Sequence, residues 1–407
     1  TGGTVVTTEV GGRKPSTVDA GINNTNQTLN TTTFVLSNGG QAQSVQPISV
    51  AGSNLNGIDF GFNFSTVVNT NDSGTGSLRQ FLLNANLLGD DSRLAQQGRT
   101  LGKENAILML PVSDPNYRAT DNYWSIALQS ALPAITAPLI LDGSLQTGSS
   151  NNRPQLELQG SNAGAGSHGL TLTATSSGSN LKHLAINRFS GAGIYLNGSS
   201  NNTLQANAIG TDPTGKLALA NTGSGIKLAA GASNNLIGGA TNGTGNQITN
   251  NGGAGIAVTD NTSLNNSLLS NSIYANGGLG IDLGEDGVTE NDAGDSDTGP
   301  NHRLNYPLIN SQGIGSNGTQ ILTYDLSLDV AAGSYRLEFF TNSAQDSSGH
   351  GEGQTYLGAK IITHPGTGAV TLKGTLNTSQ SVAAGTLVSI TTTAINGNSY
   401  GSTSEFS

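Results

Sequence analysis

Short apolar runs separated by polar and glycine-rich turns make up most of the chain. The run Ile58-Asp59-Phe60-Gly61-Phe62 alternates apolar and polar residues with period two, which is typical of a half-buried strand. Other runs hold only a few apolar residues before the next turn signal. This pattern predicts an all-β protein with many short strands and tight turns.

One segment departs from this pattern and predicts a helix near residues 77–86. Its apolar residues recur at helical spacing and share one face: Leu78, Phe81, Leu82 and Ala85. Ser77 stands where an N-cap is expected. Arg79 is placed to pair with Asp72 and hold the helix against the chain before it. We expect this helix to cover the open end of the β structure that follows.

An internal repeat occupies the middle of the chain. The unit Gly-x-Gly-Ile-x-(Leu/Val) occurs at residues 191–196, 223–228, 253–258 and 278–283. An Asn-x-Ile unit precedes three of these copies, at Asn207, Asn246 and Asn271. An Asn-x-Leu unit recurs at Leu204, Leu236 and Leu268, with two intervals of 32 residues. A fixed period of this length indicates a solenoid.

Each repeat carries three strand-sized apolar segments without helical periodicity, which predicts a parallel β-helix. The isoleucines of the repeated unit would form one inward column: Ile194, Ile226, Ile256 and Ile281. The residues that follow them would project outward: Tyr195, Lys227, Ala257 and Asp282. Glycine and asparagine suit left-handed corners. Stacked Asn207, Asn246 and Asn271 would form an amide ladder between coils.

Several motifs resemble a family of secreted bacterial right-handed β-helix proteins with a CSLREA-type motif. They lie at residues 68–74, 76–80, 132–136 and 141–143, in the Gly-Ile repeats at 191–283, and at 279–284 and 291–301. The chain departs from the family at Gln80 and Phe81, where the namesake motif has Glu and Ala, and it lacks the motif's cysteine. The resemblance implies an extracellular β-helix with a capping helix. It implies no particular reaction, because most members have none known.

The chain divides into three predicted parts. Residues 1–64 read as a short β segment, and its end resembles the last strand of the B-type repeats of bacterial surface proteins. Residues 65–310 form the β-helix. Residues 311–407 alternate at period two and resemble an immunoglobulin-like β-sandwich. The motif at 403–407 resembles a boundary after which such proteins commonly continue, so the chain could be part of a longer precursor.

Composition narrows the function classes. Charged residues are 10% of the chain, against about 25% in an average domain, and the net charge is −10. An acidic chain with few cations is not expected to bind nucleic acid or an anionic membrane surface. No apolar run is long enough to span a membrane. The absence of cysteine excludes disulfides and thiolate chemistry.

An acidic loop at residues 282–297 concentrates carboxylates in a chain otherwise poor in charge. It holds seven of the 26 acidic residues. Repulsion disfavours such a cluster unless water or a cation offsets it, and hard oxygen ligands suit Ca²⁺. The candidate metal ligands are Asp286, Asp292, Asp295 and Asp297. The alternative is a solvated loop that joins the solenoid to the sandwich.

The predicted outward positions of the coils hold few charges, and no acidic pair lies within the regular repeats. This predicts a protein that is not an enzyme, with His183 as a surface or packing residue. Tyr195 and Tyr274 are candidate stacking platforms for sugars. A polysaccharide lyase or hydrolase, or a carbohydrate-binding module, stays open as the alternative.

The function expected is that of an extracellular structural or adhesive protein of the bacterial cell surface. Three linked β modules would form a stiff rod. The β-branched segment Thr4–Val10 could add a strand to the sandwich of a neighbouring copy and propagate filaments. The expected partners are neighbouring copies, other surface components and surface polysaccharide.

Overall fold

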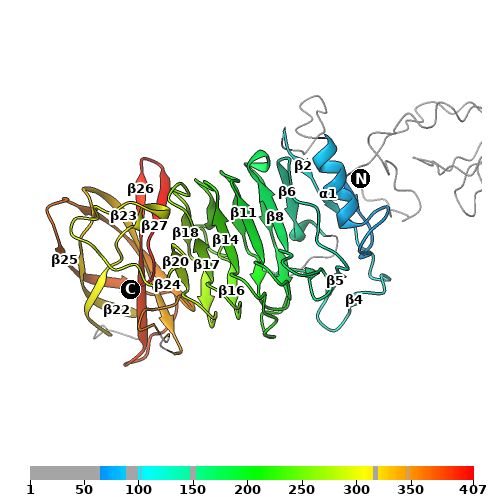
Figure 1. Cartoon of the computed structure of the whole chain (residues 1–407). Helices are drawn as coiled ribbons and strands as arrows, with labels where there is room; N and C mark the ends of the chain where they lie inside the picture. The colour runs from blue at the N-terminus through cyan, green and yellow to red at the C-terminus, as the bar shows by residue number, and fades with distance from the viewer. Residues whose placement is uncertain are drawn as a thin grey trace, which may run out of the picture.

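The computed structural model describes residues 65–88, 100, 102–146, 153–314, 320–344, 346 and 348–407. Within these ranges the chain forms a right-handed parallel β-helix followed by a β-sandwich (Figure 1). The predicted fold class is therefore confirmed. The expected N-terminal segment at 1–64, with the strand at Thr4–Val10, lies outside the described residues.

Three parallel sheets form the walls of the β-helix. The five-stranded sheet consists of β8 (Leu170–Thr173), β11 (Ile194–Asn197), β14 (Ile226–Ala229), β17 (Ile256–Val258) and β20 (Ile281–Leu283). The six-stranded sheet consists of β2 (Glu104–Asn105), β6 (Leu139–Asp142), β9 (Asn180–Lys182), β12 (Thr203–Gln205), β15 (Leu236–Gly238) and β18 (Ser267–Leu269). The seven-stranded sheet consists of β4 (Tyr117–Arg118), β5 (Tyr123–Ala127), β7 (Leu156–Gln159), β10 (Leu184–Asn187), β13 (Ala208–Ile209), β16 (Gln247–Thr249) and β19 (Ser272–Tyr274).

The predicted isoleucine column is present in the five-stranded sheet. Ile194 pairs in register with Ile226, which pairs with Ile256, which pairs with Ile281. All four side chains are buried in one hydrophobic core that runs the length of the β-helix. Alternation along each strand sends these residues inward and their neighbours outward.

At the C-terminal coils, two of the four residues that were predicted to project outward are buried. Tyr195 and Lys227 are partly exposed, but Ala257 is fully buried and Asp282 is only 8% exposed. The loop after β20 folds back over this face, since Glu285 contacts both Lys227 and Ser224.

The pairing in the six-stranded sheet corrects the two repeat intervals predicted from Leu204, Leu236 and Leu268. The sheet pairs Leu204 with Ile237 and Ile237 with Leu268, so Leu236 is not the equivalent of the two leucines. Ile237 is fully buried, whereas Leu236 is partly exposed. The intervals are therefore 33 and 31 residues rather than two of 32. One extra residue before β15 produces this shift.

The glycines of the repeated unit serve close packing rather than left-handed corners. A Cβ atom on Gly225 would lie 2.7 Å from the carbonyl oxygen of Gly255, and one on Gly255 would lie 2.6 Å from that of Gly280. Neither glycine has a positive φ angle. Left-handed corners instead hold residues such as Asn250 and Ala275. The unit is glycine-rich because adjacent coils approach each other there.

Three asparagine ladders connect successive coils. The predicted ladder is confirmed: the Nδ2 of Asn207 donates to Asn246, and that of Asn246 donates to Asn271, each over 2.9 Å. Two further ladders run along other corners: Asn202–Asn235–Asn266 and Asn221–Asn251–Asn276. Each side chain also bonds backbone groups of the adjacent coil, which satisfies buried polar atoms at the turns.

Helix α1 (Leu78–Leu88) covers the N-terminal end of the described β-helix (Figure 1). Its predicted apolar face is buried in the solenoid core, and the Ser77 hydroxyl accepts a hydrogen bond from the Gln80 amide. Arg79 bonds Asp72 over 2.6 Å and the carbonyl of Ala131, so it fastens the helix to the first coils. The short strands β1 (Thr66–Val67) and β3 (Ile107–Leu108) pair beside it. No helix in the described ranges is long and apolar enough to cross a bilayer.

The sandwich consists of two antiparallel sheets. One contains β21 (Leu308–Ile314), β22 (Ile321–Leu328) and β25 (Val370–Asn377). The other contains β24 (Thr355–His364), β23 (Gly333–Asn342), β26 (Leu387–Asn396) and β27 (Ser399–Thr403). Strand β23 is buried on both faces: Leu337 and Phe339 face the sandwich core, whereas Phe340 belongs to the solenoid core. The four-stranded sheet therefore covers the C-terminal end of the β-helix.

Candidate functional site

The acidic loop brings three of the four predicted metal ligands together. Carboxylate oxygens of Asp292, Asp295 and Asp297 lie within 4.8 Å of one another. Asp286 lies apart from them: it is largely exposed and contacts Arg303 over 3.3 Å. The Asp292 carboxylate accepts hydrogen bonds from the amide and hydroxyl of Ser296 and from the amide of Asp297, which fixes the turn of the loop.

A fourth carboxylate approaches this cluster from the sandwich. Asp329 follows β22, and its charge is one of those that raise the pKa of Asp295. Asn305 ties the two segments together: its Nδ2 donates to the carbonyls of Asp292 and Asp329 over 2.8 and 2.7 Å, and its amide donates to Asp295. No sequence pattern predicts that Asp329 lies here, because its position depends on how the sandwich packs.

The electrostatics of the cluster are unfavourable as it stands. Burial, then the charges of Asp297 and Asp292, raise the pKa of Asp295 to about 6. Burial and Asp292 likewise raise the pKa of Asp297. One oxygen of Asp297 and one of Asp329 are buried without a hydrogen-bond partner among the described residues. A shared cation would relieve this repulsion, and the oxygen set matches the preference of Ca²⁺.

Calcium binding stays a prediction, and thermal unfolding tests it. If Asp292, Asp295 and Asp297 bind Ca²⁺, each tenfold excess of free Ca²⁺ over Kd adds about 1.4 kcal/mol to the free energy of unfolding. An Asp295→Asn variant should lose this dependence. Asp325→Asn, on the exposed face of the sandwich, is the matched control and should keep it. Identical melting in Ca²⁺ and in chelator would contradict the prediction.

Three glutamates of the sandwich accept hydrogen bonds from backbone amides at the last coil. Glu338 accepts from the amide of Ser270 over 2.7 Å and Glu352 from that of Ala275 over 2.9 Å. Glu405 accepts from Leu283 over 2.8 Å. Because no further coil follows, these amides would otherwise lose their partners. The glutamates thus close the end of the solenoid.

The C-terminal residues take part in the same closure. Phe406 is 3% exposed and packs into the solenoid core against Phe340 at a ring distance of 5.4 Å. Asn301 continues one asparagine ladder, since its Oδ1 accepts from the amide of Asn266. The segment that resembled a boundary motif is therefore a packed part of this junction.

The raised pKa of a carboxylate at this junction predicts that the protein becomes less stable as the pH rises. Burial raises the pKa of Glu405 to about 7, and nearby Asp282 adds to the rise. Between the ordinary value of 4.5 and about 7, the folded state binds more protons than the unfolded state, so stability falls as pH rises. Glu405 alone contributes up to about 3 kcal/mol to this fall.

Chemical denaturation between pH 5 and 8 measures this slope. The wild-type chain should lose unfolding free energy across the window, and Glu405→Gln should make the loss smaller. Asp295 titrates in the same window in both proteins, so only the difference between them isolates Glu405. Equal slopes in the two proteins would contradict the assignment.

A partly exposed histidine lies at the corner between β9 and β10, beside the end of β6. His183 Nδ1 lies 2.8 Å from Asp142, which also accepts from the Ser144 hydroxyl. Burial tends to raise the pKa of Asp142, but the bonds from His183 and Ser144 outweigh it, so the pKa is lowered. An ionised carboxylate on Nδ1 leaves Nε2 available as a base. His183 was expected to be a surface or packing residue, and its pairing with Asp142 was not anticipated.

The two predicted stacking tyrosines have different surroundings. Tyr195 packs against His168 with ring centroids 4.8 Å apart on the partly exposed five-stranded sheet. The Tyr274 hydroxyl instead accepts a hydrogen bond from Gln247. Sequence periodicity located both residues but could not show these partners.

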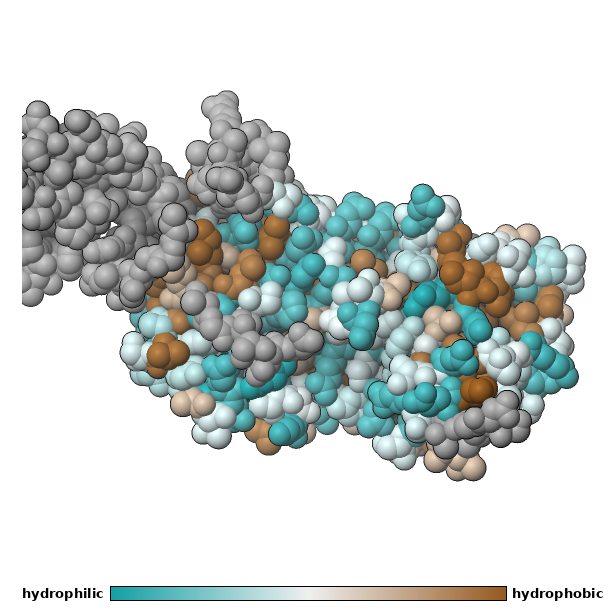
Figure 2. Space-filling view, turned by 180° about the vertical axis from the view of Figure 1, so that it is seen from behind, coloured by the Kyte–Doolittle hydropathy of each residue, from teal (hydrophilic) through white to brown (hydrophobic). Residues whose placement is uncertain are grey.

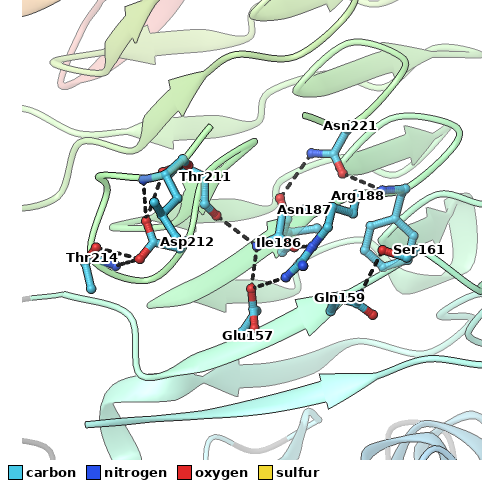
Figure 3. Close-up of polar contacts among 12 residues, drawn as sticks. Glu157, Gln159, Ser161, Ile186, Asn187, Arg188, Thr211, Asp212, Thr214 and Asn221 are labelled. Atoms are coloured by element: carbon cyan, nitrogen blue, oxygen red, sulfur yellow. Dashed lines mark hydrogen bonds and ion pairs between the residues drawn. The ribbon is translucent and has the colours of Figure 1, made fainter. Parts of the chain in front are cut away.

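A buried carboxylate holds an arginine at the corner after β10 (Figure 3). Glu157 accepts from Arg188 Nη2 over 2.8 Å and from Asn187 over 2.9 Å. Asn187 also donates to the carbonyl of Thr211, which anchors the loop that begins there. The Asp212 carboxylate accepts five hydrogen bonds within that loop and stabilises it.

No family model and no curated protein matches the sequence. The solved structures similar to it include the enzymatically active domain of tailspike protein 2 of bacteriophage CBA120, at 11% identity and a TM-score of 0.15. The match covers 77% of this chain and 62% of that one. That neighbour is described as an enzymatically active domain, and the expectation that this chain is not an enzyme is withdrawn. The comparisons do not confirm the resemblances to the CSLREA-type family and to immunoglobulin-like domains.

Proposed function

We propose that the chain is an extracellular structural or adhesive protein of the bacterial cell surface, built as a stiff β rod. The observation that carries this proposal is the junction between β-helix and sandwich. Phe340 and Phe406 extend the solenoid core into the sandwich, and Glu338 lies fully buried between the two modules. Because these side chains are buried where the two modules meet, the junction leaves no hinge, and the modules extend one another.

The polar surface of the rod supports the proposed extracellular role. Figure 2 shows a mostly hydrophilic surface between the two ends of the solenoid, with apolar patches over the sandwich. Asparagine, serine and threonine side chains with few charges suit contact with surface polysaccharide. Neighbouring copies are the other proposed partner.

The sandwich offers an edge for such a neighbour. Strand β21 lies at the edge of its sheet and borders an apolar groove of ≈230 Å³ near β26. Leu322, Val382 and Val388 line this groove. We propose that the β-branched segment Thr4–Val10 of a second copy adds to β21 and seats its apolar side chains here. A head-to-tail contact of this kind propagates filaments.

Electron microscopy and sedimentation velocity of the intact chain test the assembly. We expect filaments or a ladder of oligomers, and monomers only once residues 1–12 are deleted. Ala384→Asp, which places a charge at an exposed position of the groove, should block assembly in the same way, whereas Ala359→Asp on β24 should not. A monodisperse monomer from the intact chain, or polymers after the deletion, would contradict the proposal.

A carbohydrate-active protein is the second candidate, favoured by the Asp142–His183 pair. The carboxylate holds the imidazole so that Nε2 can accept a proton from a substrate or water. Release of reducing ends from a polysaccharide panel tests it. Activity that His183→Gln abolishes and Gln205→Ala leaves intact would support this candidate, and no release from any polysaccharide would contradict it.

A further inference from the structure

A polar groove of ≈500 Å³ lies over the turns that connect the seven-stranded and five-stranded sheets. It is lined by Gly160, Ser161, Asn162, Gly164, Ala165, Arg188, Ser190 and Thr222. Its volume falls in the range of small-molecule sites. Arg188 is the one charged side chain among these lining residues, in a chain whose net charge is −10.

Two buried residues beneath the groove hold the guanidinium of Arg188 in place. Glu157, whose side chain is 3% exposed, accepts from Nη2, and the fully buried Asn187 accepts from Nε over 2.9 Å. The Arg188 side chain itself remains 34% exposed. Its Nη1 makes no hydrogen bond to any described residue and is free for a ligand. Figure 3 shows the arginine held between these two partners.

The remaining lining groups are hydroxyls, amides and glycine backbone. The exposed Ser161, Asn162 and Thr222 surround the arginine without a large apolar side chain. Ser190 and Gly164 are bonded to each other, which holds the rim in place. One fixed guanidinium, whose charge Glu157 offsets in part, among sugar-compatible donors and acceptors matches a monoanionic ring with several hydroxyls.

We propose that this groove binds acidic saccharides, with Arg188 bonding the carboxylate of a uronic acid residue. Glu157 and Asn187 act as positioning residues, since both bond the arginine from beneath the groove. The inference deepens the adhesive part of the proposed function and rests on it. It names the ligand class as uronate-containing polysaccharide.

Titration calorimetry with trigalacturonate and its neutral methyl ester tests the proposal. The intact chain should bind trigalacturonate with a Kd of about 1 mM or below, a value reachable with a few hydrogen bonds. The methyl ester keeps the rings and their hydroxyls but carries no charge, so it should bind about tenfold or more weakly. Equal binding of the two probes, or no binding of trigalacturonate, would overturn the proposal.

Two variants locate the site. Arg188→Gln should abolish binding, but it leaves Glu157 buried without its cation and could impair folding. Thr222→Glu changes only an exposed rim residue and should weaken trigalacturonate binding about tenfold by repulsion. Thr241→Glu, exposed on another loop of the solenoid, is the matched control. Equal losses from Thr222→Glu and Thr241→Glu would place the binding elsewhere and refute the site.

Electron microscopy of Thr222→Glu separates this inference from the proposed function. The variant should keep the rod and its assembly while it loses saccharide binding. If the protein forms rods that assemble but binds no uronate, only the proposal about the groove is refuted. A chain that binds uronate through Arg188 but forms no rod refutes the structural role.

Discussion

Replacing Asn246 by alanine should destabilise the protein by about 4 kcal/mol, the largest effect expected of a single polar residue in the solenoid. Asn246 is 1% exposed and stands in the middle of its ladder. Its Oδ1 accepts from the amide and the side chain of Asn207, and its Nδ2 donates to Leu204 and Asn271. Alanine would leave all of these buried groups unpaired, which costs more than the lost bonds alone.

Urea unfolding, followed by circular dichroism and by fluorescence, measures this loss. Trp124 is the one tryptophan of the chain and lies buried near the N-terminal coils, so its fluorescence reports on coils remote from Asn246. Both signals should shift together if the coils unfold cooperatively. Asn242→Ala, at an exposed position of the adjacent loop, should change stability by less than about 0.5 kcal/mol. A loss below about 1 kcal/mol for Asn246→Ala would contradict the structural role of the ladder.

Replacing Glu338 by alanine should cost about 3–5 kcal/mol, the range for breaking a buried ion pair by removing one partner. The carboxylate is fully buried and accepts from Arg336 Nε over 2.8 Å and from the amide and hydroxyl of Ser270. Burial raises the pKa of Glu338, although Arg336 opposes the shift. Alanine would leave Arg336 without its carboxylate partner and the last coil without one of its three glutamate contacts.

Calorimetry of the intact chain measures this second loss. The wild-type transition should be a single one, and Glu338→Ala should lower it or split it into separate transitions of sandwich and solenoid. Glu338→Gln keeps the shape and one acceptor and should lose less. Lys373→Ala breaks the exposed pair with Asp325 on the same sandwich and should change little. An unchanged transition in Glu338→Ala would show that the junction does not depend on this group.

The elements predicted best from sequence are those with a repeated local pattern. The isoleucine column, the Asn207–Asn246–Asn271 ladder and the α1 face depend on spacing that stays regular over several turns. The same reasoning misplaced Leu236, because a single inserted residue moves a strand by one position and reverses its faces. It also assigned the glycines to corners, since spacing alone does not reveal the approach of the next coil.

The junction groups could not be predicted because their partners are distant in sequence. Glu405 contacts Leu283, and Glu338 contacts Ser270. A weak signal did exist: Glu338 stands between Leu337 and Phe339 in an alternating strand, on the face that should be polar. Arg336 and Phe340 share that face, which suggests that it is covered. No comparable sequence pattern indicates the position of Asp329.

Single-particle electron microscopy of the intact chain tests whether the β-helix and the sandwich form one stiff rod. The buried junction predicts that solenoid and sandwich form one straight body with the same relative orientation in every class average. Glu338→Ala should broaden that distribution. If the wild-type protein instead shows two bodies that meet at a variable angle, with the hinge between residues 284 and 308, it is not a stiff rod.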